Sequence, residues 1–380
     1  MSVGIGRILT HLRDFGPTSR ANLARETGLS SAGVTKICAS LDEAGLLRES
    51  ASKETALGRP ATEVSIHPQG GYVLAIHLSP VRAHVAVCNL AMQVLSEDTV
   101  DYGASASETD VVERAVAVAR GVVTAARIPF DQLLGVGVGV PGSVDEEGRI
   151  NTHSVLAGWR NVPFAKMFEA ALGLPAILSH NATAIAIAEA RYGAWKGSES
   201  LLYLLLGKGI GGGYVKTGAH ERTSIVEIGH VVVDPNGPLC RCSGTGCLER
   251  YFSEAPLRQM VGRDDIPSSQ LISTAMQVEG WSEIYEYFVQ ALATTVTLLG
   301  PETIVLGGDF LTAPDHFVAE LRKDLPPRVM PQQRANLAIE RASLATPSGV
   351  QGAACIALDT FFFSSGPAHL GRSSNHANRA

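Results

Sequence analysis

The spacing of apolar residues changes once along this chain of 380 residues, at about Gly71. Before that point, three short segments carry apolar residues at helical spacing. After it, strand-like runs alternate with long helical segments, which is typical of an α/β fold. We therefore expect a small N-terminal domain over residues 1–68 and an α/β body after it. The strands and helices expected in the body are residues 72–78, 83–89, 109–126, 134–140, 176–179, 182–192, 200–206, 212–215 and 303–306.

The N-terminal segment predicts three helices in a helix-turn-helix arrangement. Gly16-Pro17 ends the first helix, and Thr18 or Ser19 can cap the second. Gly28 suits the turn between the second and third, and Ser30 can cap the third. An apolar stripe accounts for one face of the third helix and leaves small or polar side chains outward near its N-terminus. Such side chains suit a helix that enters the major groove of DNA closely, although a plain solvated face has the same composition. The candidate DNA-binding residues of this helix are Ser30, Ser31, Ala32, Gly33, Thr35 and Lys36.

Two short strands, residues 46–49 and 62–66, are expected after the third helix and would form a β-wing. Between them lies Gly58-Arg59-Pro60, in which Arg59 would be extended and slim enough for the minor groove. An ordinary hairpin turn is the alternative. Three helices followed by such a hairpin predict a winged helix-turn-helix. Because acidic and basic residues nearly cancel here, useful binding to operator DNA would need a homodimer, or a dimer of dimers, that contacts two half-sites.

Composition excludes some classes of protein. The formal net charge of −6 argues against a chain built wholly to wrap nucleic acid, but not against a small DNA-binding domain. No apolar run approaches the ~18 residues that span a bilayer, and the charged start is not a signal peptide. We expect a cytoplasmic protein with no membrane partner. Residues 364–380 are rich in Ser, Gly, Asn and His, which predicts a mobile tail.

Residues 230–247 hold the densest group of metal-binding residue types. His230, Cys240, Cys242 and Cys247 follow one another in a stretch rich in Gly and Pro. Three thiolates and one imidazole form a closed tetrahedral zinc set with no open position for water, so we interpret the site as structural Zn2+. A metal would also supply stability where helix and strand patterns are weak. Free thiols are the alternative.

The segment Glu227-Ile-Gly-His230, together with Gly237-Pro-Leu-Cys240-Arg-Cys242-Ser-Gly-Thr-Gly246-Cys247-Leu-Glu249, resembles the signature of the ROK family of repressors, uncharacterised reading frames and sugar kinases. The resemblance covers the chain to about residue 363. It implies a two-lobed, actin-like (ribonuclease-H-like) sugar-kinase fold behind the winged helix-turn-helix. The first lobe would be residues 69–182, completed by a C-terminal helix at 349–363, and the second lobe residues 183–348. The family's zinc ligands match the same histidine and three cysteines.

The resemblance also implies a sugar site. Asn181, Glu227, His230 and Glu249 match the family's sugar-binding residues. Amide and carboxylate groups can hold neighbouring hydroxyls by paired hydrogen bonds. The alternative for Asn181 is that it merely caps the helix that begins at Ala182.

Departures from the family pattern decide between kinase and regulator. Family kinases have an Asp where this chain has Ala182, and that Asp takes the proton from the sugar hydroxyl. Their first phosphate turn, Asp-x-Gly-Gly-Thr, aligns with His77-Leu78-Ser79-Pro80-Val81. Their second, glycine-rich phosphate turn survives in Gly207–Gly213, with Lys208 in place of Thr. Phosphoryl transfer needs positioned metal, phosphate contacts and an oriented nucleophile, so we expect no catalytic residues and no enzyme activity.

The sequence thus predicts a DNA-binding transcriptional regulator of carbohydrate metabolism genes, a repressor, whose body binds a sugar or a sugar-derived effector. Two alternatives stay open. One is an active ATP-dependent sugar kinase that carries a DNA-binding head. The other is a regulator controlled by a protein partner, with an unused cleft.

Overall fold

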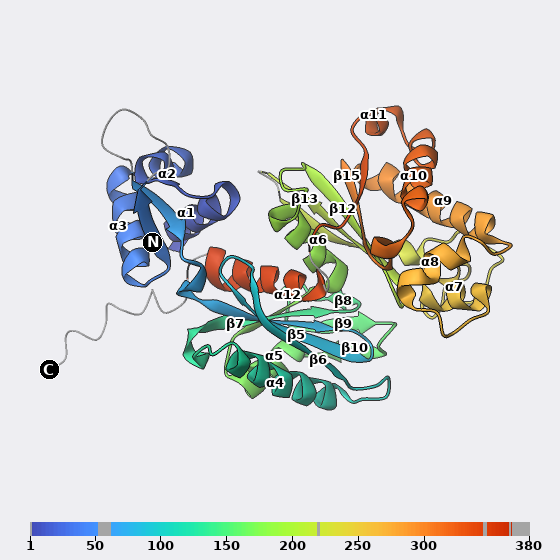
Figure 1. The fold of residues 1–380 in the computed structure, drawn as a ribbon, viewed down its shortest axis with the longest axis horizontal. Helices are drawn as coiled ribbons and strands as arrows, with labels where there is room; N and C mark the ends of the chain where they lie inside the picture. The colour runs from blue at the N-terminus through green and yellow to red at the C-terminus, as the bar shows by residue number, and fades with distance from the viewer. Residues whose placement is uncertain (1, 52–61, 219–220, 345–347, 365, 367–380) are drawn as a thin grey trace.

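The structure of the chain is a computed structural model that describes residues 2–51, 62–218, 221–344, 348–364 and 366. A small head lies beside two α/β lobes, and one helix from the end of the chain lies along the first lobe with its end beside the head (Figure 1). The expected wing tip with Arg59, and all of the expected tail except Ser364 and Gly366, lie outside the described residues.

The head has three helices and a three-stranded sheet of order β1-β3-β2. The predicted helices are confirmed, and their caps are the predicted kind: Ser19 Oγ accepts from Asn22 N at 3.1 Å, and Ser30 Oγ accepts from Gly33 N at 3.2 Å. Strand β1 was not expected, because two residues carry no periodicity. The elements are α1 (Ser2–Phe15), β1 (Thr18–Ser19), α2 (Arg20–Thr27), α3 (Ser31–Glu43), β2 (Leu47–Ala51) and β3 (Thr62–Ile66).

The first lobe is a five-stranded sheet of order β11-β7-β4-β5-β6. Helices α4 and α5 cover one face, and α12 lies on the other (Figure 1). A second, three-stranded sheet of order β10-β9-β8 lies at its edge. The elements are β4 (Tyr72–Leu78), β5 (Arg82–Asn89), β6 (Val94–Asp101), α4 (Glu108–Ala125), β7 (Leu133–Val140), β8 (Ser143–Val144), β9 (Asn151–Ser154), β10 (Trp159–Val162), α5 (Phe164–Leu172), β11 (Ala176–His180) and α12 (Ser348–Leu358), which a π-helical turn continues over Asp359–Phe363.

The alternation of glycine and valine along β7 explains how α12 can pack so closely on the sheet. Its valines point into the core beneath α4 and α5, while every second residue is glycine. A Cβ at Gly137 would lie 1.9 Å from the carbonyl oxygen of Ala353 in α12, and a Cβ at Gly135 would lie 2.3 Å from the ring of Phe361. The glycines of this strand therefore serve tight packing of α12 against the sheet.

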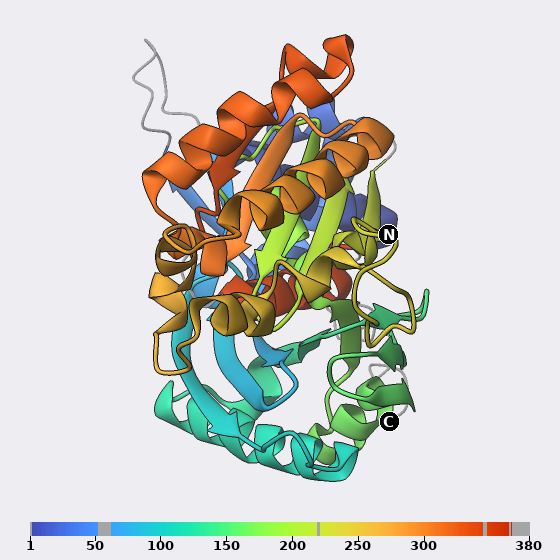
Figure 2. The same cartoon turned by 90° about the vertical axis from the view of Figure 1, so that its right-hand side faces the viewer.

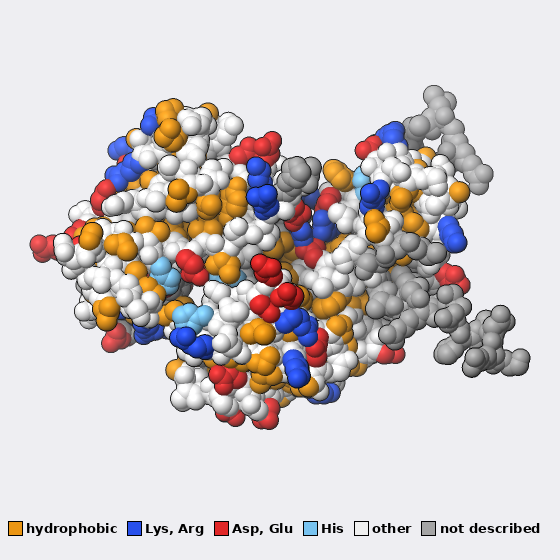
Figure 3. All heavy atoms as spheres, turned by 180° about the vertical axis from the view of Figure 1, so that it is seen from behind, with side chains coloured by type: hydrophobic (Ala, Val, Ile, Leu, Met, Phe, Trp, Pro, Cys, Tyr) orange, Lys and Arg blue, Asp and Glu red, His pale blue; other side chains and the backbone are white. Residues whose placement is uncertain are grey.

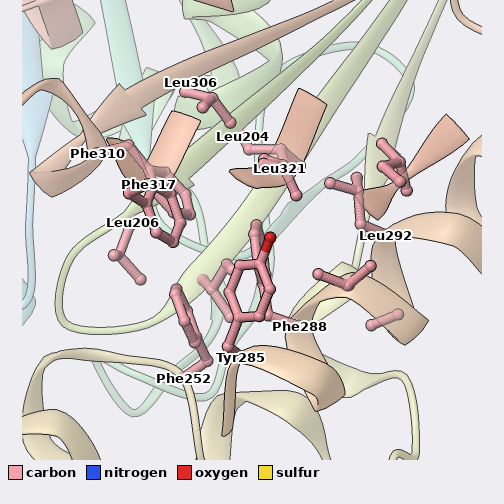
Figure 4. Packing of buried hydrophobic residues seen from close by; sticks show 14 of the residues in the cluster. Leu204, Leu206, Phe252, Tyr285, Phe288, Leu292, Leu306, Phe310, Phe317 and Leu321 are labelled. Carbon is pink, nitrogen blue, oxygen red and sulfur yellow. The ribbon is translucent and has the colours of Figure 1, made fainter. Parts of the chain in front are cut away.

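The second lobe is a five-stranded sheet of order β14-β13-β12-β15-β16, covered on one face by helices α7–α10. Figure 2 shows these helices in front of the strands. Stacked aromatic rings fill this layer: the Phe252 and Phe288 centroids lie 4.5 Å apart, beside Phe310 and Phe317 (Figure 4). The elements are β12 (Ser200–Leu206), β13 (Ile210–Lys216), β14 (Arg222–Val226), α7 (Glu254–Val261), α8 (Ser268–Ala275), α9 (Trp281–Leu299), β15 (Thr303–Gly308), α10 (Asp315–Asp324), α11 (Pro331–Arg334) and β16 (Ala338–Arg341).

Helix α6 (Asn181–Tyr192) lies between the two lobes and contacts both. It packs on α12 so closely that a Cβ at Gly352 would lie 2.8 Å from the backbone nitrogen of Ile185. On its other side, a Cβ at Gly213 of β13 would lie 2.5 Å from the carbonyl oxygen of Ala182. Glycines on both neighbours therefore fix this helix at backbone contact. No helix in the described parts of the chain combines the length and apolar character needed to cross a membrane.

Replacement of Gly137 by Ala should destabilise the protein by about 1–3 kcal/mol, because the added methyl group overlaps the backbone of α12. Gly121→Ala is the matched control. Gly121 lies in α4 with no atom near its added Cβ, and alanine should stabilise a helix interior there by about 0.5–1 kcal/mol. Thermal and urea unfolding of the full chain measure both. A common direction of shift for the two variants would contradict the packing argument.

Candidate functional site

The N-terminal end of α3 presents its predicted side chains to solvent. Ser30, Ser31, Ala32, Thr35 and Lys36 are exposed, and Gly33 is half-buried. The opposite face of the helix packs into the head through Val34, Cys38 and Leu41, which are almost fully buried. The apolar stripe therefore turns the candidate DNA-binding residues outward, as the sequence predicts.

Charges on the head differ in how far they are already paired. Arg20 forms an ion pair with Glu49, and Arg25 forms one with Glu26. Lys36 has no ion-pair partner among the described residues, so its ammonium group is available to a phosphate.

Four metal-ligand atoms converge in the second lobe. His230 Nδ1 lies 3.8 Å from Cys240 Sγ, Cys242 Sγ lies 3.6 Å from Cys247 Sγ, and the ligand atoms of all four residues lie within 4.8 Å of one another. Sulfur atoms ~2.3 Å from a tetrahedral zinc lie about 3.8 Å apart. The 3.6 Å separation is far beyond a disulfide bond, and the thiols are free. The cluster has the donor set and the size for one metal ion.

Tight turns bring the cysteines together. Cys240 N donates to Gly244 O at 2.7 Å, and Gly244 N donates to Cys242 Sγ at 3.4 Å. Gly246 has φ +67°, and a Cβ there would lie 1.5 Å from the carbonyl oxygen of Asp234. Only glycine fits that position, which places Cys247 against the other ligands.

Three of the four predicted sugar contacts gather beside the metal-ligand cluster. His230 and Glu249 lie in two short 3-10 turns that pack on each other, and Glu227 immediately precedes the first turn. The pKa of Glu249 is raised, chiefly because its carboxyl group is buried and also because the charge of Glu227 lies nearby. The charges of His230 and Arg241 act in the opposite direction. Glu249 Oε2 lies against the Gly207–Gly209 turn, where a Cβ at Gly209 would come within 2.3 Å of it. These groups can accept and donate hydrogen bonds to neighbouring hydroxyls.

Asn181 lies apart from that group. Its Nδ2 donates to Leu78 O at 3.0 Å, and its Oδ1 is buried with no hydrogen-bond partner among the described residues. No hydrogen bond joins it to Glu227, His230 or Glu249 in the parts of the chain that the structure describes. The capping alternative is wrong: the helix begins at Asn181 itself, with His180 at the N-cap position and no side-chain cap.

The segments that align with the kinase phosphate turns make hydrogen bonds and ion pairs within the chain. Burial and the charge of His84 lower the pKa of His77 to about 4, so its imidazole is neutral near pH 7. The following turn is closed by its own hydrogen bonds, Ser79 N to Arg82 O at 2.8 Å and Ser79 Oγ to Arg82 O at 3.0 Å. Lys208 Nζ lies 2.9 Å from Glu254 Oε2. Ala182 is 1% exposed and offers no proton acceptor.

A cavity of about 420 Å3 beside the start of α6 was not expected from the sequence. His180 and Thr183 line it from α6 and its N-cap, with His180 Nδ1 3.2 Å from Thr183 Oγ1. None of the four predicted sugar contacts lines it. The acidic run Asp145-Glu146-Glu147 forms another wall. The remaining lining residues are Val144, Gly148, Ile177, Leu178, Ser179, Thr223, Ser224 and Ile225.

Comparison with known proteins identifies relatives over most of the chain. The family model described as "ROK family" matches residues 73–360. A putative xylose repressor from Caldicellulosiruptor sp. (strain Rt8B.4) is 25% identical over 379 residues, which cover 92% of this chain and 94% of that protein. A glucokinase from Thermotoga maritima is 28% identical over 290 residues, which cover 70% of this chain and 90% of that protein.

Among solved structures, a ROK family transcriptional regulator described as a homologue of the E. coli Mlc protein has a TM-score of 0.80 and 23% identity. The match covers 96% of this chain and 97% of that one. At this identity the likeness shows the fold, a head followed by an actin-like pair of lobes.

Ser30→Ala should destabilise the head by about 1 kcal/mol, because the serine hydroxyl accepts from Gly33 N at the start of α3. Ser31→Ala removes a neighbouring exposed hydroxyl that caps nothing, and it should stay within about 0.5 kcal/mol of the wild type. Hydrogen exchange of the α3 amides measures the local loss. Equal protection in the two variants would show that the cap contributes nothing to α3.

Proposed function

Because the chain belongs to the ROK family, we propose that it is a DNA-binding repressor of carbohydrate metabolism genes, controlled by a sugar or a sugar-derived effector. The observation that carries the proposal is the outward face of α3 on a head attached to a pair of sugar-kinase-like lobes. The repressor relative matches over 92% of the chain, whereas the glucokinase match covers 70%. This difference in coverage favours a regulator over a kinase.

The proposed DNA contacts are those on the exposed end of α3, Ser30, Ser31, Ala32, Gly33, Thr35 and Lys36, with Arg59 added by the wing. A helix whose N-terminal residues are small or polar can approach base edges closely. Among the described residues of the head, Arg20 and Arg25 already form ion pairs, so one copy would bind weakly. A homodimer that contacts two half-sites is therefore part of the proposal, as is the division into a head (1–68) and two lobes (69–182 with 349–363, and 183–348).

The proposed effector site combines Asn181 with Glu227, His230 and Glu249. An amide oxygen buried without a partner costs free energy unless a ligand or water meets it. A carboxylate whose pKa is raised by burial is stabilised when hydroxyl groups donate to it. Both residues thus gain from a ligand rich in hydroxyls, which is why we assign a sugar.

The proposed metal is structural Zn2+, held by His230, Cys240, Cys242 and Cys247. The donor set and the separations of 3.6 and 3.8 Å fit zinc, and four protein ligands leave no position for a reactive water. Zinc would fix the turn that carries His230, and so the position of that residue beside Glu249.

We also propose that the lobes do not phosphorylate their ligand. Ala182 lacks the general base, His77 is neutral where family kinases have a carboxylate, and the turn after it satisfies its own backbone groups. Bound sugar would then act only through its effect on conformation.

The first test measures DNA affinity of the zinc-loaded full chain with and without glucose, xylose or N-acetylglucosamine, on a duplex selected by the wild type from a random library. We expect one sugar to change the affinity by about 5- to 150-fold, the usual range of coupling between two sites. Asn181→Ala should abolish that change, because it removes a proposed hydroxyl partner. Asn236→Ala, on an exposed position of the second lobe, should keep it.

Failure of the wild type to select any duplex would overturn the DNA-binding part, and indifference to a broad sugar panel would overturn the sensing part. The same preparation decides the competing function. Sugar-dependent ATP consumption in a coupled assay would identify a kinase.

The second test removes a metal ligand. Cys247→Ser should lose bound zinc and lower the unfolding midpoint by roughly 5 °C or more, since each kcal/mol moves the midpoint of a domain of this size by about 2–4 °C. Cys38→Ser changes a buried thiol of the head, far along the chain from the cluster, and should keep its zinc. Metal analysis of the two purified variants gives the comparison, and equal zinc in both would refute the assignment.

A further inference from the structure

One carboxylate joins the head to the helix between the lobes. Asp359 Oδ1 accepts from Arg13 Nη1 at 2.8 Å, and Asp359 Oδ2 pairs with Nη1 of Arg191. Each carboxylate oxygen therefore faces a different arginine, and Oδ2 also accepts from Cys355 Sγ at 3.7 Å. Arg13 belongs to the last turn of α1 in the head, and Arg191 to the last turn of α6.

The pairs lie in partly buried surroundings. The side chains of Arg13, Asp359 and Arg191 are 8%, 22% and 18% exposed. Figure 3 shows charged side chains of both signs gathered in the groove between the head and the second lobe. Salt screens such pairs far less than it screens exposed ones, and their strength depends closely on geometry.

On the head side, several contacts hold α1 where Arg13 meets Asp359. The Arg13 guanidinium carbon lies 5.1 Å from the centroid of the Phe363 ring, and Lys196 Nζ donates to Arg13 O at 3.1 Å. A Cβ at Gly6 would lie 2.2 Å from the carbonyl oxygen of Ser364. Helix α1 therefore rests directly on the end of the C-terminal helix, and a shift of that end displaces the head.

On the body side, α6 is tied to the second lobe near the same end. The Glu189 carboxylate accepts from Ser343 N at 2.8 Å and Leu344 N at 2.9 Å, on the segment that leaves the second lobe after β16. Arg191 also pairs with Glu221, which immediately precedes β14. Movement of the second lobe therefore acts on the end of α6 that carries Arg191.

The opposite end of α6 is the proposed sugar contact. Asn181 begins the helix, and ten residues at ~1.5 Å each separate it from Arg191, about 15 Å along the helix axis. We propose that the ion-pair bridge Arg13–Asp359–Arg191 is the coupling element through which sugar bound at the proposed contact Asn181 changes the position of the DNA-binding head. The inference rests on the proposed function and identifies the residues that couple the sugar contact to the head.

In this proposal the bridge has two states, which coupling requires: the observed one, and one in which Arg191 has moved away from Asp359. With α6 in the observed position, both oxygens of Asp359 are used. A shift of Arg191 would leave Asp359 Oδ2 with only the Cys355 thiol as donor, at 3.7 Å, while Arg13 keeps Asp14, at 2.7 Å, as a second partner. The head thus gains an alternative arrangement without leaving a charge unpaired.

Asp359→Asn breaks the bridge at its centre. It leaves Arg13 with Asp14 and Arg191 with Glu221, so the chain is expected to fold. Asp14→Asn is the matched control, because it removes a carboxylate from the same arginine without touching the bridge. Arg191→Gln breaks the bridge from the α6 side and must reproduce the effect of Asp359→Asn.

The experiment uses the zinc-loaded full chain, the selected duplex and glucose, xylose or N-acetylglucosamine in turn. For the sugar that acts on the wild type, we expect Asp359→Asn and Arg191→Gln to reduce the sugar-induced ratio of DNA affinities about fivefold or more, toward one. Sugar affinity measured by calorimetry without DNA should stay within about twofold, and Asp14→Asn should keep the ratio of the wild type.

The outcomes separate the two proposals. A wild-type response that survives unchanged in Asp359→Asn overturns the bridge alone, and so does an equal loss in Asp14→Asn. A wild type that shows no response to any of the sugars overturns the proposed function, and the bridge with it. Sugar-induced changes in hydrogen exchange of the α1 amides, present in the wild type and absent in Asp359→Asn, give a second reading independent of DNA.

Discussion

Backbone contact between α12, α6 and their glycine neighbours is the constraint on which the rest of the arrangement depends. Gly137 lets α12 pack closely on the first sheet. Gly352 lets α12 and α6 pack closely on each other, and Gly213 lets α6 pack closely on the second sheet. Interiors packed at this density deform little, so a helix held on both sides moves as a body or not at all. The candidate sugar contact at one end of α6 and Arg191 at the other are therefore parts of one rigid element.

Burial within this packing also explains which elements of the fold could be predicted from the sequence. Long periodic segments such as residues 72–78 and 200–206 were predicted to the residue, because a buried strand carries an unbroken apolar run. The helix caps at Ser19 and Ser30 were also predicted, since their chemistry is local. Strand β6 was not predicted: its burial pattern is largely exposed, and it forms only because β5 offers an edge. Nothing local marks such a strand.

The candidate site also has parts that could be predicted from the sequence and parts that could not. The metal-ligand cluster could be predicted because ligand chemistry and spacing are visible in the residues, and the resemblance to the ROK family supplied Glu227 and Glu249. The buried amide oxygen of Asn181 and the ion pairs of Asp359 could not be predicted. Arg13 and Asp359 are 346 residues apart, and only the fold brings them together. Long-range polar contacts leave no periodic trace, so the connection between head and lobes emerges from the structure alone.

This division bears on how the proposed sugar site in the lobes could act on the head. Glycine contacts set where the elements sit, and changes there cost stability at once. Polar contacts between elements can exchange partners at small cost, provided that no charge is left buried alone. Arg13 has two carboxylate neighbours and Arg191 has two as well, so each arginine can lose one partner and keep the other. Such duplication is what the proposed junction with two positions requires.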